Sequence, residues 1–402
     1  MTKSILFIFL DYPPKSGPGA QRNFYLNKHF SQLGWQTKVL TMTLQSNGMG
    51  DNSSDDKEVI RAFGKDATQI FSIMGKYPKF IEIPDRWYLW ILPAIIKGYK
   101  ACRNNNVDYI YASFPSYSSA IVGTLLSKIL NKPLLVDLRD PFRFRYDPEN
   151  MPVHWLYRWL EKKTITQASM LITTTPECSE FYAKLYPEFP SNNIHVIHNG
   201  FAKEFHDEFE VPQKLKNSQP FTLLHSGILY QIGRNPDVLL KAIHFLISQG
   251  EIKKGQFILR FRGANIWPAL SLQIDELGLT DFVEFKERIP YTQAIEEMSV
   301  VSANVLIQNS LFNLQIPSKL YDILALKKSL LAITDKQGAL AKEMTHLDLP
   351  YFSSTVEETV ILLRKLMTVA QIPLTNNSLN CRNRYYMNQK LSNILNTSLK
   401  SS

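Results

Sequence analysis

The sequence predicts an α/β protein with two successive open sheets of parallel strands, each covered by helices. The chain has 402 residues, which is too long for one ordinary hydrophobic core and suits two domains of roughly 150–200 residues. In both halves, short apolar segments rich in β-branched residues alternate with helical segments. This alternation is typical of parallel sheets whose strands are joined by crossover helices.

The first half begins with SILFIFL, residues 4–10, which has the composition of a buried parallel strand. A loop rich in Gly and Pro follows at 11–20, and a helical stretch over 21–34 ends at Gly34. We expect these segments to belong to one domain over residues 1–205. Its further predicted strands are WQTKVLTM (35–42), VDYIYASF (107–114), KPLLVDLRD (132–140), SMLITTT (169–175) and NIHVIHNG (193–200).

Residues 206–220 are polar and lack periodicity, and we interpret them as a linker. The alternation then restarts and predicts a second domain over residues 221–375. Its predicted strands are FTLLHSG (221–227), QFILRFRG (256–263), FVEFKERI (282–289), ANVLIQN (303–309), SLLAIT (329–334) and LPYFSS (349–354). The last segment, 376–402, contains one more helical candidate. Ligands of open α/β sheets bind at the carboxyl ends of strands, so we expect the functional site in the cleft between the domains.

Composition and charge exclude several classes of protein. Three cysteines lie far apart and form no CxxC motif, which favours a reducing compartment. No apolar run has the length of a signal peptide or a membrane span, so we expect a cytoplasmic protein. The net charge of +9 would attract phosphates, nucleic acid or an anionic membrane. Nucleic-acid binding is not expected, because the sequence has neither a basic helix nor a stacking platform.

The segment WLYRWLEKK, residues 155–163, groups Trp155, Leu156, Trp159 and Leu160 on one helical face. We expect this face to pack into the core. The alternative is a membrane interface, which Trp beside Lys and Arg also suits.

The segment QIPSKLYDILA, residues 315–325, places Ser318 and Lys319 at the start of a predicted helix, directly after a strand. The free N–H groups and the positive dipole end of such a helix favour an anion, above all phosphate. Asp322 lies three residues after Lys319, on about the same helical face, and would suit a ribose diol. The alternative is an ordinary helix cap with a solvated ion pair.

The segment HSGILYQIGRNPDVLLKAI, residues 225–243, places Gly227 and Arg234 in the loop between a strand and a helix. Asn235 is a natural N-cap, with Pro236 at the first helical position. A guanidinium in this loop could clamp phosphate oxygens beside the site described above. The alternative is a surface arginine that precedes a capped helix.

Two stretches in the first half carry further candidates. Gly17 and Gly19 in YPPKSGPGAQR allow the backbone to approach a ligand closely, although the segment is also consistent with a simple connector. The absence of a GxGxxG pattern argues against a dehydrogenase. In LLVDLRDPFRFRY a strand ends at Arg139 and Asp140, where charges are costly to bury unless they are paired or functional. Asp140 could orient a sugar hydroxyl or accept a proton, and the alternative is a structural Arg–Asp pair.

Five segments, in their order and spacing, resemble the retaining glycosyltransferases of family four. They are YPPKSGPGAQRN, DLRDPF, VIHNGF, HSGILYQIGRNPDVLLKAI and IPSKLYDILALKKSLLAI. The resemblance covers nearly the whole chain and is strongest to bacterial members of polysaccharide biosynthesis. It implies the GT-B fold, with two Rossmann-like domains whose parallel sheets face each other across a cleft. It also implies transfer of a sugar, with retention, from a nucleotide-diphosphate sugar to a saccharide or lipid-linked saccharide.

The resemblance also assigns residues. It implies that Arg234 and Lys319 meet the diphosphate and that Asp140 lies near the donor sugar and the acceptor, so that these three are catalytic. The donor-binding residues that it implies are Gly17, Gly19, Arg139, Gly227, Gln315, Ser318 and Asp322. Asp322 would contact the ribose, and the final helix, 381–399, would cross back to the first domain. The family needs no metal or other cofactor, because arginine, lysine and the helix dipole stabilise the leaving diphosphate.

The chain departs from the pattern of the family at two places. The family pairs two glutamates eight positions apart, and here those positions hold Leu314 and Asp322. The contact of the first glutamate with the donor sugar is then lost or supplied by a neighbour such as Gln315. The sequence GPG at Gly17–Gly19 replaces the usual adjacent glycines.

Two other functions are consistent with the predicted fold. One is a nucleotide-sugar epimerase, and the other is a non-catalytic subunit that binds a nucleotide sugar. For the transferase we expect a nucleotide-sugar donor and an acceptor that is a saccharide or lipid-linked. We also expect peripheral contact with an anionic membrane at the inner face of the cytoplasmic membrane, which the basic charge balance favours.

Overall fold

The computed structural model describes residues 3–15, 17–43, 58–104, 107–142, 154–207, 220–368 and 381–398. These residues form two compact units, Met1–His198 with Tyr385–Ser402, and Asn199–Arg384. Of the linker that the sequence predicts at 206–220, residues 208–219 lie outside the described part of the chain.

The first unit is built on a sheet of parallel strands in the order β3-β2-β1-β4-β5-β6-β7. The strands are β1 Ser4–Ile8, β2 Gln36–Met42, β3 Val59–Ala62, β4 Tyr109–Phe114, β5 Leu134–Leu138, β6 Ala168–Thr173 and β7 Ile194–Val196. The strand order reverses between β1 and β4, which is the arrangement of doubly wound sheets. The structure confirms the predicted strands and adds β3, a short edge strand with little apolar signal.

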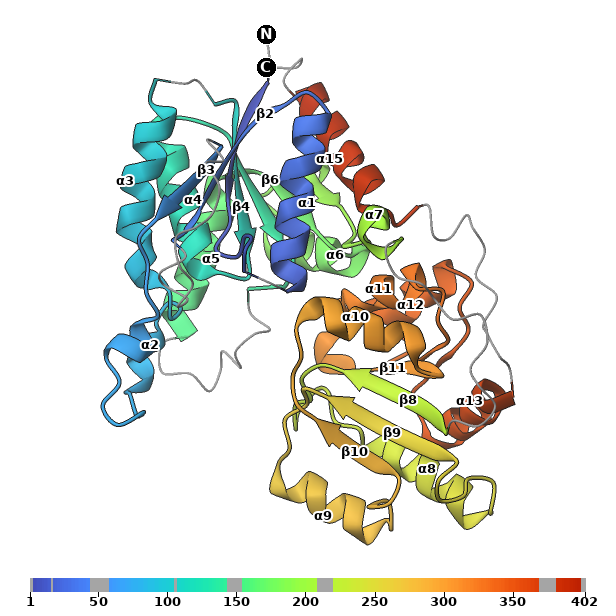
Figure 1. Ribbon diagram of the computed structural model, residues 1–402. Helices are drawn as coiled ribbons and strands as arrows, with labels where there is room; N and C mark the ends of the chain where they lie inside the picture. Colours follow the sequence, from blue (N-terminus) through green and yellow to red (C-terminus); the bar gives the residue numbers. More distant parts are fainter. Residues whose placement is uncertain are drawn as a thin grey trace. The chain divides into compact units, whose positions relative to one another are not determined.

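Helices cover both faces of this sheet (Figure 1). The helices of this unit are α1 Pro18–Gln32, α2 Ala67–Ile70, α3 Ile91–Cys102, α4 Tyr117–Leu130, α5 His154–Gln167, α6 Pro176–Leu185 and α15 Arg384–Ser398, of which the short α2 lies beyond the end of α3. The C-terminal helix α15 packs on the first unit beside α1, where Leu391 and Leu395 join the same apolar core as Leu26 and Phe30. The Trp35 Nε1–H donates to Ser392 Oγ at 2.8 Å and fixes this contact.

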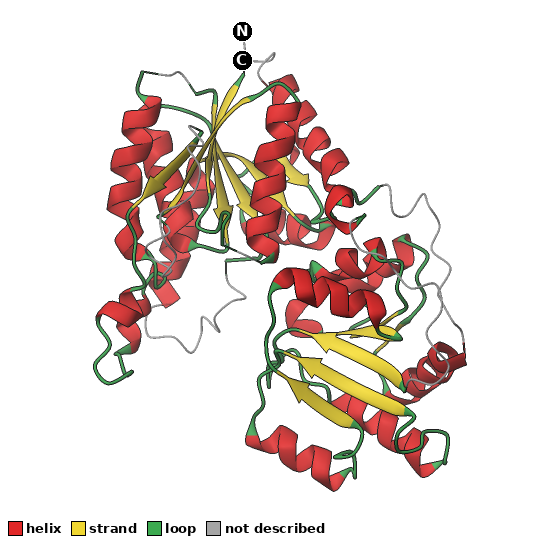
Figure 2. Ribbon diagram, in the orientation of Figure 1, coloured by secondary structure: helices red, strands yellow, loops and turns green. Residues whose placement is uncertain are grey.

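The second unit has its own parallel sheet, in the order β10-β9-β8-β11-β12-β13 (Figure 2). Its strands are β8 Phe221–Ser226, β9 Phe257–Arg262, β10 Val283–Lys286, β11 Ala303–Gln308, β12 Leu330–Thr334 and β13 Phe352–Ser353. Its helices are α7 Lys203–His206, α8 Asp237–Ser248, α9 Pro268–Glu276, α10 Tyr291–Val300, α11 Lys319–Ala325, α12 Ala339–His346 and α13 Val356–Thr368. The strand order reverses between β8 and β11, which is the position where open α/β sheets bind their ligands.

The prediction that Trp155 and Trp159 belong to the core is wrong. They are 62% and 51% exposed on α5, whereas Tyr157 and Glu161 of the same helix are buried. The periodicity of a helix defines its faces but does not say which face meets the sheet. None of the helices in the described residues combines the length and apolar character that crossing a membrane requires.

A buried ion pair supports α11 from within the second unit. Arg382 donates from Nε and Nη2 to the Glu343 carboxylate at 2.6 and 3.0 Å, and both side chains are more than nine-tenths buried. The Tyr321 hydroxyl, on α11, donates to the same carboxylate at 3.1 Å. If either Arg382 or Glu343 is replaced by a neutral side chain, the other remains as a buried charge without a counter-charge.

We predict that Glu343→Gln lowers the free energy of unfolding by about 3–5 kcal/mol, because it leaves the Arg382 guanidinium buried without a counter-charge. The matched control is Glu251→Gln, which breaks an equally bidentate pair with Arg364 on the exposed surface of the same unit. Denaturant unfolding of both variants should show a large loss for the first and little change for the second. Equal losses would contradict this account.

Candidate functional site

Two loops at the reversal of strand order in the second unit form one hydrogen-bonded body. The loop after β11 is fixed by Gln308, whose Nε2 donates to the carbonyls of Phe312 and Gln315 at 3.1 and 2.9 Å. It is joined to the loop after β8 because the Asn309 N–H donates to the Gly233 carbonyl at 2.9 Å. These hydrogen bonds therefore fix the positions of the two loops, and of their side chains, relative to each other.

Arg234 lies in the loop after β8 and is held by two aromatic rings. Its guanidinium carbon lies 4.7 Å from the ring centre of Phe312 and 5.4 Å from that of Tyr230. The two rings stack on each other at 6.4 Å. Gly233, with φ +94°, allows this packing, since a Cβ there would lie 2.4 Å from the Phe312 ring. Cation–π contacts orient the guanidinium plane without consuming its N–H donors.

The structure brings two predicted residues, Gly227 and Lys319, into direct contact. A Cβ on Gly227 would lie 2.0 Å from Lys319 Nζ, so the ammonium occupies space that only glycine leaves open. Gly227 also has φ +138°, a conformation that favours glycine. Burial, together with the positive charges of Arg234 and Arg288, lowers the pKa of Lys319 to about 8, although the negative charge of Asp322 opposes the shift.

His225 is a component of this site that sequence analysis missed. It is buried at the end of β8, and its Nδ1 lies 3.1 Å from the Val305 carbonyl. Burial, then the charge of Lys319, lowers the pKa of His225 to about 3, so the ring is neutral. A neutral ring that donates from Nδ1 presents Nε2 as an acceptor, and this buried atom has no hydrogen-bond partner among the described residues. The ring thus adds no positive charge beside Lys319.

The remaining predicted residues of the second unit lie on the first turn of α11 and in the segment before it. Asp322 is fully buried and accepts a hydrogen bond from the Tyr291 hydroxyl at 3.0 Å. Ser318 precedes the helix, but its side chain makes no capping hydrogen bond. Gln315 is half-buried in the loop, where its N–H donates to the Phe312 carbonyl at 2.9 Å. The expectation that α8 starts at Pro236 was off by one residue, since the helix begins at Asp237.

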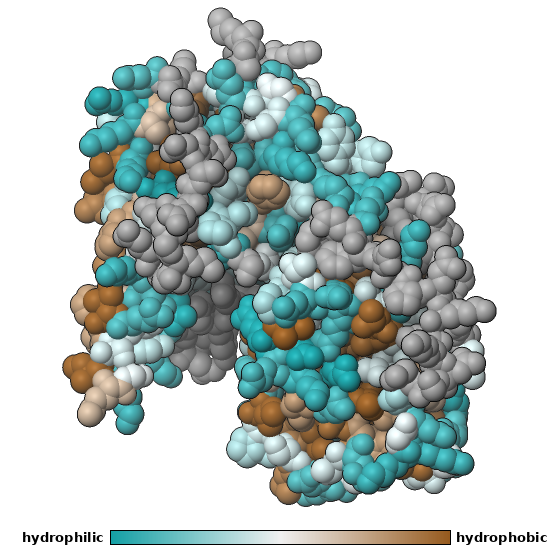
Figure 3. Space-filling model, viewed as in Figure 1, coloured by the Kyte–Doolittle hydropathy of each residue, from teal (hydrophilic) through white to brown (hydrophobic). Residues whose placement is uncertain are grey.

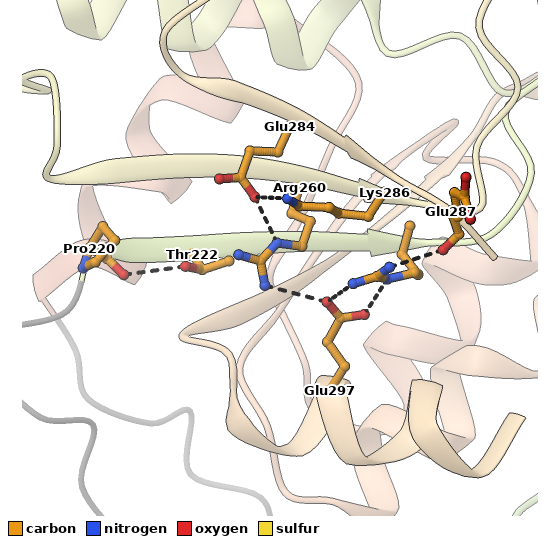
Figure 4. Close-up of polar contacts among 8 residues, drawn as sticks. Pro220, Thr222, Arg260, Glu284, Lys286, Glu287 and Glu297 are labelled. Carbon is orange, nitrogen blue, oxygen red and sulfur yellow. Dashed lines mark hydrogen bonds and ion pairs between the residues drawn. The ribbon is translucent and has the colours of Figure 1, made fainter. Parts of the chain in front are cut away.

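Arg288, which follows β10, is an exposed cation of this site that sequence analysis also missed. Its neighbours are fixed by the network in Figure 4. The Arg262 guanidinium donates twice to Glu297 of α10, at 2.8 Å each, and once to the Glu287 carbonyl at 2.9 Å. Arg260 donates to Glu297 at 3.3 Å and to Glu284 at 3.1 Å. The network therefore ties the segment that carries Arg288 to the sheet.

The candidates of the first unit lie at the carboxyl ends of β1 and β5. Arg139 donates from Nε to the Phe114 carbonyl at 2.9 Å. A Cβ on Gly19 would lie 3.1 Å from Arg139 Nη1, so Gly19 makes room for this guanidinium. Gly17, with φ +132°, precedes α1. Asp140 is half-buried and lies near Cys178. Burial raises the pKa of the Cys178 thiol, and the negative charge of Asp140 raises it further.

In the described part of the chain, Arg139 and Asp140 do not form the structural ion pair that the sequence left as an alternative. Arg139 makes hydrogen bonds with Phe114 and Thr174. The buried ion pair of this region joins Arg22 to Asp137 at 3.0 Å instead. The Ser113 hydroxyl also donates to Asp137, at 3.1 Å. Sequence analysis missed this pair because its members are far apart in the chain. An aspartate in the middle of the apolar strand LLVDL was the signal.

Metal ions in proteins are held by grouped His, Cys, Asp and Glu side chains. Within the described ranges, no three or more His, Cys, Asp and Glu residues are grouped so that they could hold a metal ion.

Comparison with known proteins gives a family match for the first unit. The model of the family described as Glycosyltransferase Family 4 matches residues 22–205. No curated protein sequence matches the chain.

Solved structures match over nearly the whole chain. A sucrose-phosphate synthase from Thermosynechococcus elongatus superposes with a TM-score of 0.66 at 13% identity and covers 100% of both chains. WaaG, a glycosyltransferase involved in lipopolysaccharide biosynthesis, gives 0.63 at 12% identity, covering 97% of this chain and 99% of its own. HepE from Anabaena, in complex with UDP and glucose, gives 0.61 at 14% identity, covering 98% and 100%.

The same fold also occurs in a Listeria monocytogenes protein described as a putative UDP-N-acetylglucosamine 2-epimerase, with a TM-score of 0.56 at 11% identity over 100% of this chain and 98% of that one. At these identities the likeness shows the fold, and it confirms the predicted GT-B class. The fold alone does not decide between transfer and epimerisation.

We predict that Lys319→Met raises the free energy of unfolding at pH 7 by about 3 kcal/mol, because the pKa falls from 10.5 to about 8 on folding. At pH 7 both states hold the proton, and the folded state carries the cost of the buried charge. Between pH 8 and 10.5 the folded protein has lost the proton that the unfolded chain retains, so wild-type stability rises with pH relative to the variant.

Denaturant unfolding at a series of pH values checks this prediction. The advantage of Lys319→Met should shrink steadily from pH 8 to pH 10.5. The control Lys241→Met removes an exposed lysine of α8 that pairs with Asp237, and it should show no such trend. A constant difference between wild type and Lys319→Met at every pH would contradict the buried position of the ammonium.

Proposed function

We propose that the chain is a glycosyltransferase that moves a sugar, with retention, from a nucleotide-diphosphate sugar to a saccharide or lipid-linked saccharide in cell-surface polysaccharide synthesis. The observation that carries this proposal is the convergence of Lys319 and Arg234 at the reversal of strand order, with Gly227 opening the space between loop and helix. The family match of residues 22–205 supports the class of reaction. The UDP and glucose bound to HepE support the class of donor.

The charges of the site suit a diphosphate leaving group. Lys319, Arg234 and Arg288 are close enough that the charges of the two arginines lower the pKa of the lysine. Such clustered cations repel one another until an anion binds, so a diphosphate would relieve the repulsion and raise the pKa of Lys319. In the reaction, the same cations would stabilise the negative charge that develops on the leaving group.

The other residues take roles that fit their positions. Asp322, oriented by Tyr291, would accept from the ribose hydroxyls, and Gln315 would contact the donor sugar. Arg139 would contact the donor sugar, and Asp140 would lie near the donor sugar and the acceptor. The bond from the anomeric carbon to the diphosphate breaks while the acceptor oxygen bonds to that carbon on the same face. The acceptor proton passes to the leaving phosphate, and the protein supplies orientation and charge.

We propose that the reaction needs no metal ion. Arg234, Lys319 and Arg288 supply the positive charge that a divalent cation would otherwise bring to the diphosphate. We place the protein in the cytoplasm, with a lipid-linked acceptor presented at the inner face of the cytoplasmic membrane.

Calorimetric titration with UDP and GDP tests the donor site. We predict micromolar binding of one nucleotide, and a loss of about 10–100-fold in affinity in Lys319→Ala and in Arg234→Ala, since each removes a charge-assisted contact. The control is Lys241→Ala, which removes an exposed lysine of the same unit and should stay within about twofold of wild type. Unchanged affinity in both site variants would exclude the proposed diphosphate site.

Product analysis separates the three functions that fit the fold. A transferase incubated with nucleotide sugar and acceptor releases the nucleoside diphosphate and forms a glycoside, whose anomeric configuration NMR reports. An epimerase inverts a sugar centre and keeps the nucleotide attached. A non-catalytic subunit binds the nucleotide sugar and changes neither, and either of these last results would refute the transferase.

A further inference from the structure

The segment that joins β3 to α3 exposes large apolar side chains. Ile73, Met74 and Phe80 are 79%, 98% and 69% exposed, and Phe71 is exposed beside them. Figure 1 shows α2 and the turn after it beyond one end of α3, at the margin of the first unit. Isolated apolar residues are common on protein surfaces, but a cluster of this size at the tip of one segment marks an interaction site.

The tip is an ordered turn rather than a random loop. Ile73 and Lys76 form an antiparallel bridge, with backbone hydrogen bonds of 2.9 and 3.0 Å in both directions. Met74 and Gly75 occupy the turn with φ of 52° and 78°. Asn or Asp is the favoured partner of Gly in such a turn, and a methionine there has both an unfavourable backbone and an exposed side chain. The fold itself gains nothing from Met74.

Helix α3, which follows this segment, is apolar on two faces. Ala94, Gly98 and Cys102 face the unit and are buried. Leu92, Ile96 and Tyr99 recur at helical spacing on the opposite face and are exposed. An amphipathic surface helix keeps one face polar, so a helix that is apolar on both faces fits a second apolar environment.

Two exposed tryptophans lie at the same edge of this unit. Helix α4 packs between α3 and α5 in one layer, and Trp155 and Trp159 lie near the start of α5. Crossover helices run opposite to their strands, so the starts of α3 and α5 lie at the same edge of the sheet. Figure 3 shows apolar side chains along α3 and around α2 on the same margin. Trp is typical of the boundary between water and lipid.

Basic residues surround the apolar ones. Residues 59–104 contain eight Lys and Arg against three Asp and Glu. Asp66 pairs with Arg86 at 3.3 Å, and Asp85 accepts hydrogen bonds from Ser116 and Ser118, so both carboxylates have partners within the fold. The lysines that stand exposed beside the apolar side chains are Lys65, Lys76, Lys79, Lys97 and Lys100.

We propose that this surface docks on an anionic lipid bilayer, with the Ile73–Lys76 turn entering the interface. Apolar side chains of the β3–α3 segment and of α3, with lysines beside them and tryptophans at the same edge of the unit, match the layered chemistry of acyl chains and anionic headgroups. A second copy of the chain is a poor occupant, because a symmetric contact would press this basic surface against itself. The inference deepens the proposed function by naming where the chain would meet the membrane of a lipid-linked acceptor.

Co-sedimentation with vesicles of phosphatidylglycerol and phosphatidylethanolamine tests the inference. The double variant Ile73→Ser/Met74→Ser should lower the partition coefficient at least about tenfold, because it removes the apolar groups that enter the lipid. The matched control Leu272→Ser/Ile361→Ser removes two similarly exposed apolar side chains from the second unit and should change it less than about twofold.

The charge component is tested separately. Lys76→Ser and Lys79→Ser should each weaken binding about fivefold. Raising the salt to about 0.5 M, or replacing the anionic lipid with phosphatidylcholine, should remove the same contribution. The affinity of every variant for the nucleotide, measured in parallel without vesicles, should equal that of wild type. This control tests the membrane inference separately from the proposed donor site.

Three results would overturn the inference. Wild-type protein could ignore anionic vesicles at low salt, or Ile73→Ser/Met74→Ser could bind them as wild type does. Sedimentation equilibrium could instead show that wild type is a dimer which the same variant dissociates, and the occupant would then be a second copy of the chain.

Discussion

The contact of the Lys319 ammonium with the backbone at Gly227 is the constraint on which the candidate site depends. It requires β8 beside β11, because these strands deliver the glycine and the lysine to the same edge of the sheet. It requires glycine at position 227, since any side chain would occupy the place of the ammonium. The hydrogen bond from Asn309 to Gly233 then locks the two loops together and brings Arg234 to the same place.

The clustered positive charges of the site lower the stability of the folded chain, and several neighbouring groups limit this loss. Burial of Lys319 and the positive charges of the nearby arginines lower the pKa of this lysine and so disfavour its charged form. The negative charge of Asp322 offsets part of this effect. His225 stays neutral and adds no further repulsion. Aromatic rings and the Arg262–Glu297 pair orient the cations without neutralising the cluster. An anion that binds there meets donors already in position, which is the electrostatic preorganisation that catalysis of group transfer requires.

Most strands were predictable because they are apolar or alternate apolar with polar residues, whereas the short edge strand β3 was missed. The expectation that Gly227, Arg234 and Lys319 meet followed from the rule that ligands bind at strand ends. The partners of these residues were not predictable. Tyr230 and Phe312 lie in different loops, and Arg22 and Asp137 are far apart in sequence, so their pairing exists only in the folded chain. Trp155 and Trp159 were misplaced because periodicity does not say which helical face is buried.

A crystal structure of the chain with UDP bound would show whether Lys319 and Arg234 hold the diphosphate. We expect the diphosphate within hydrogen-bond distance of Lys319 Nζ and of the Arg234 guanidinium, with the ribose towards Asp322. A diphosphate bound elsewhere on a folded chain, with the Lys319 ammonium still closed against Gly227, would contradict this expectation. In that case the lysine would be a structural element of the loop.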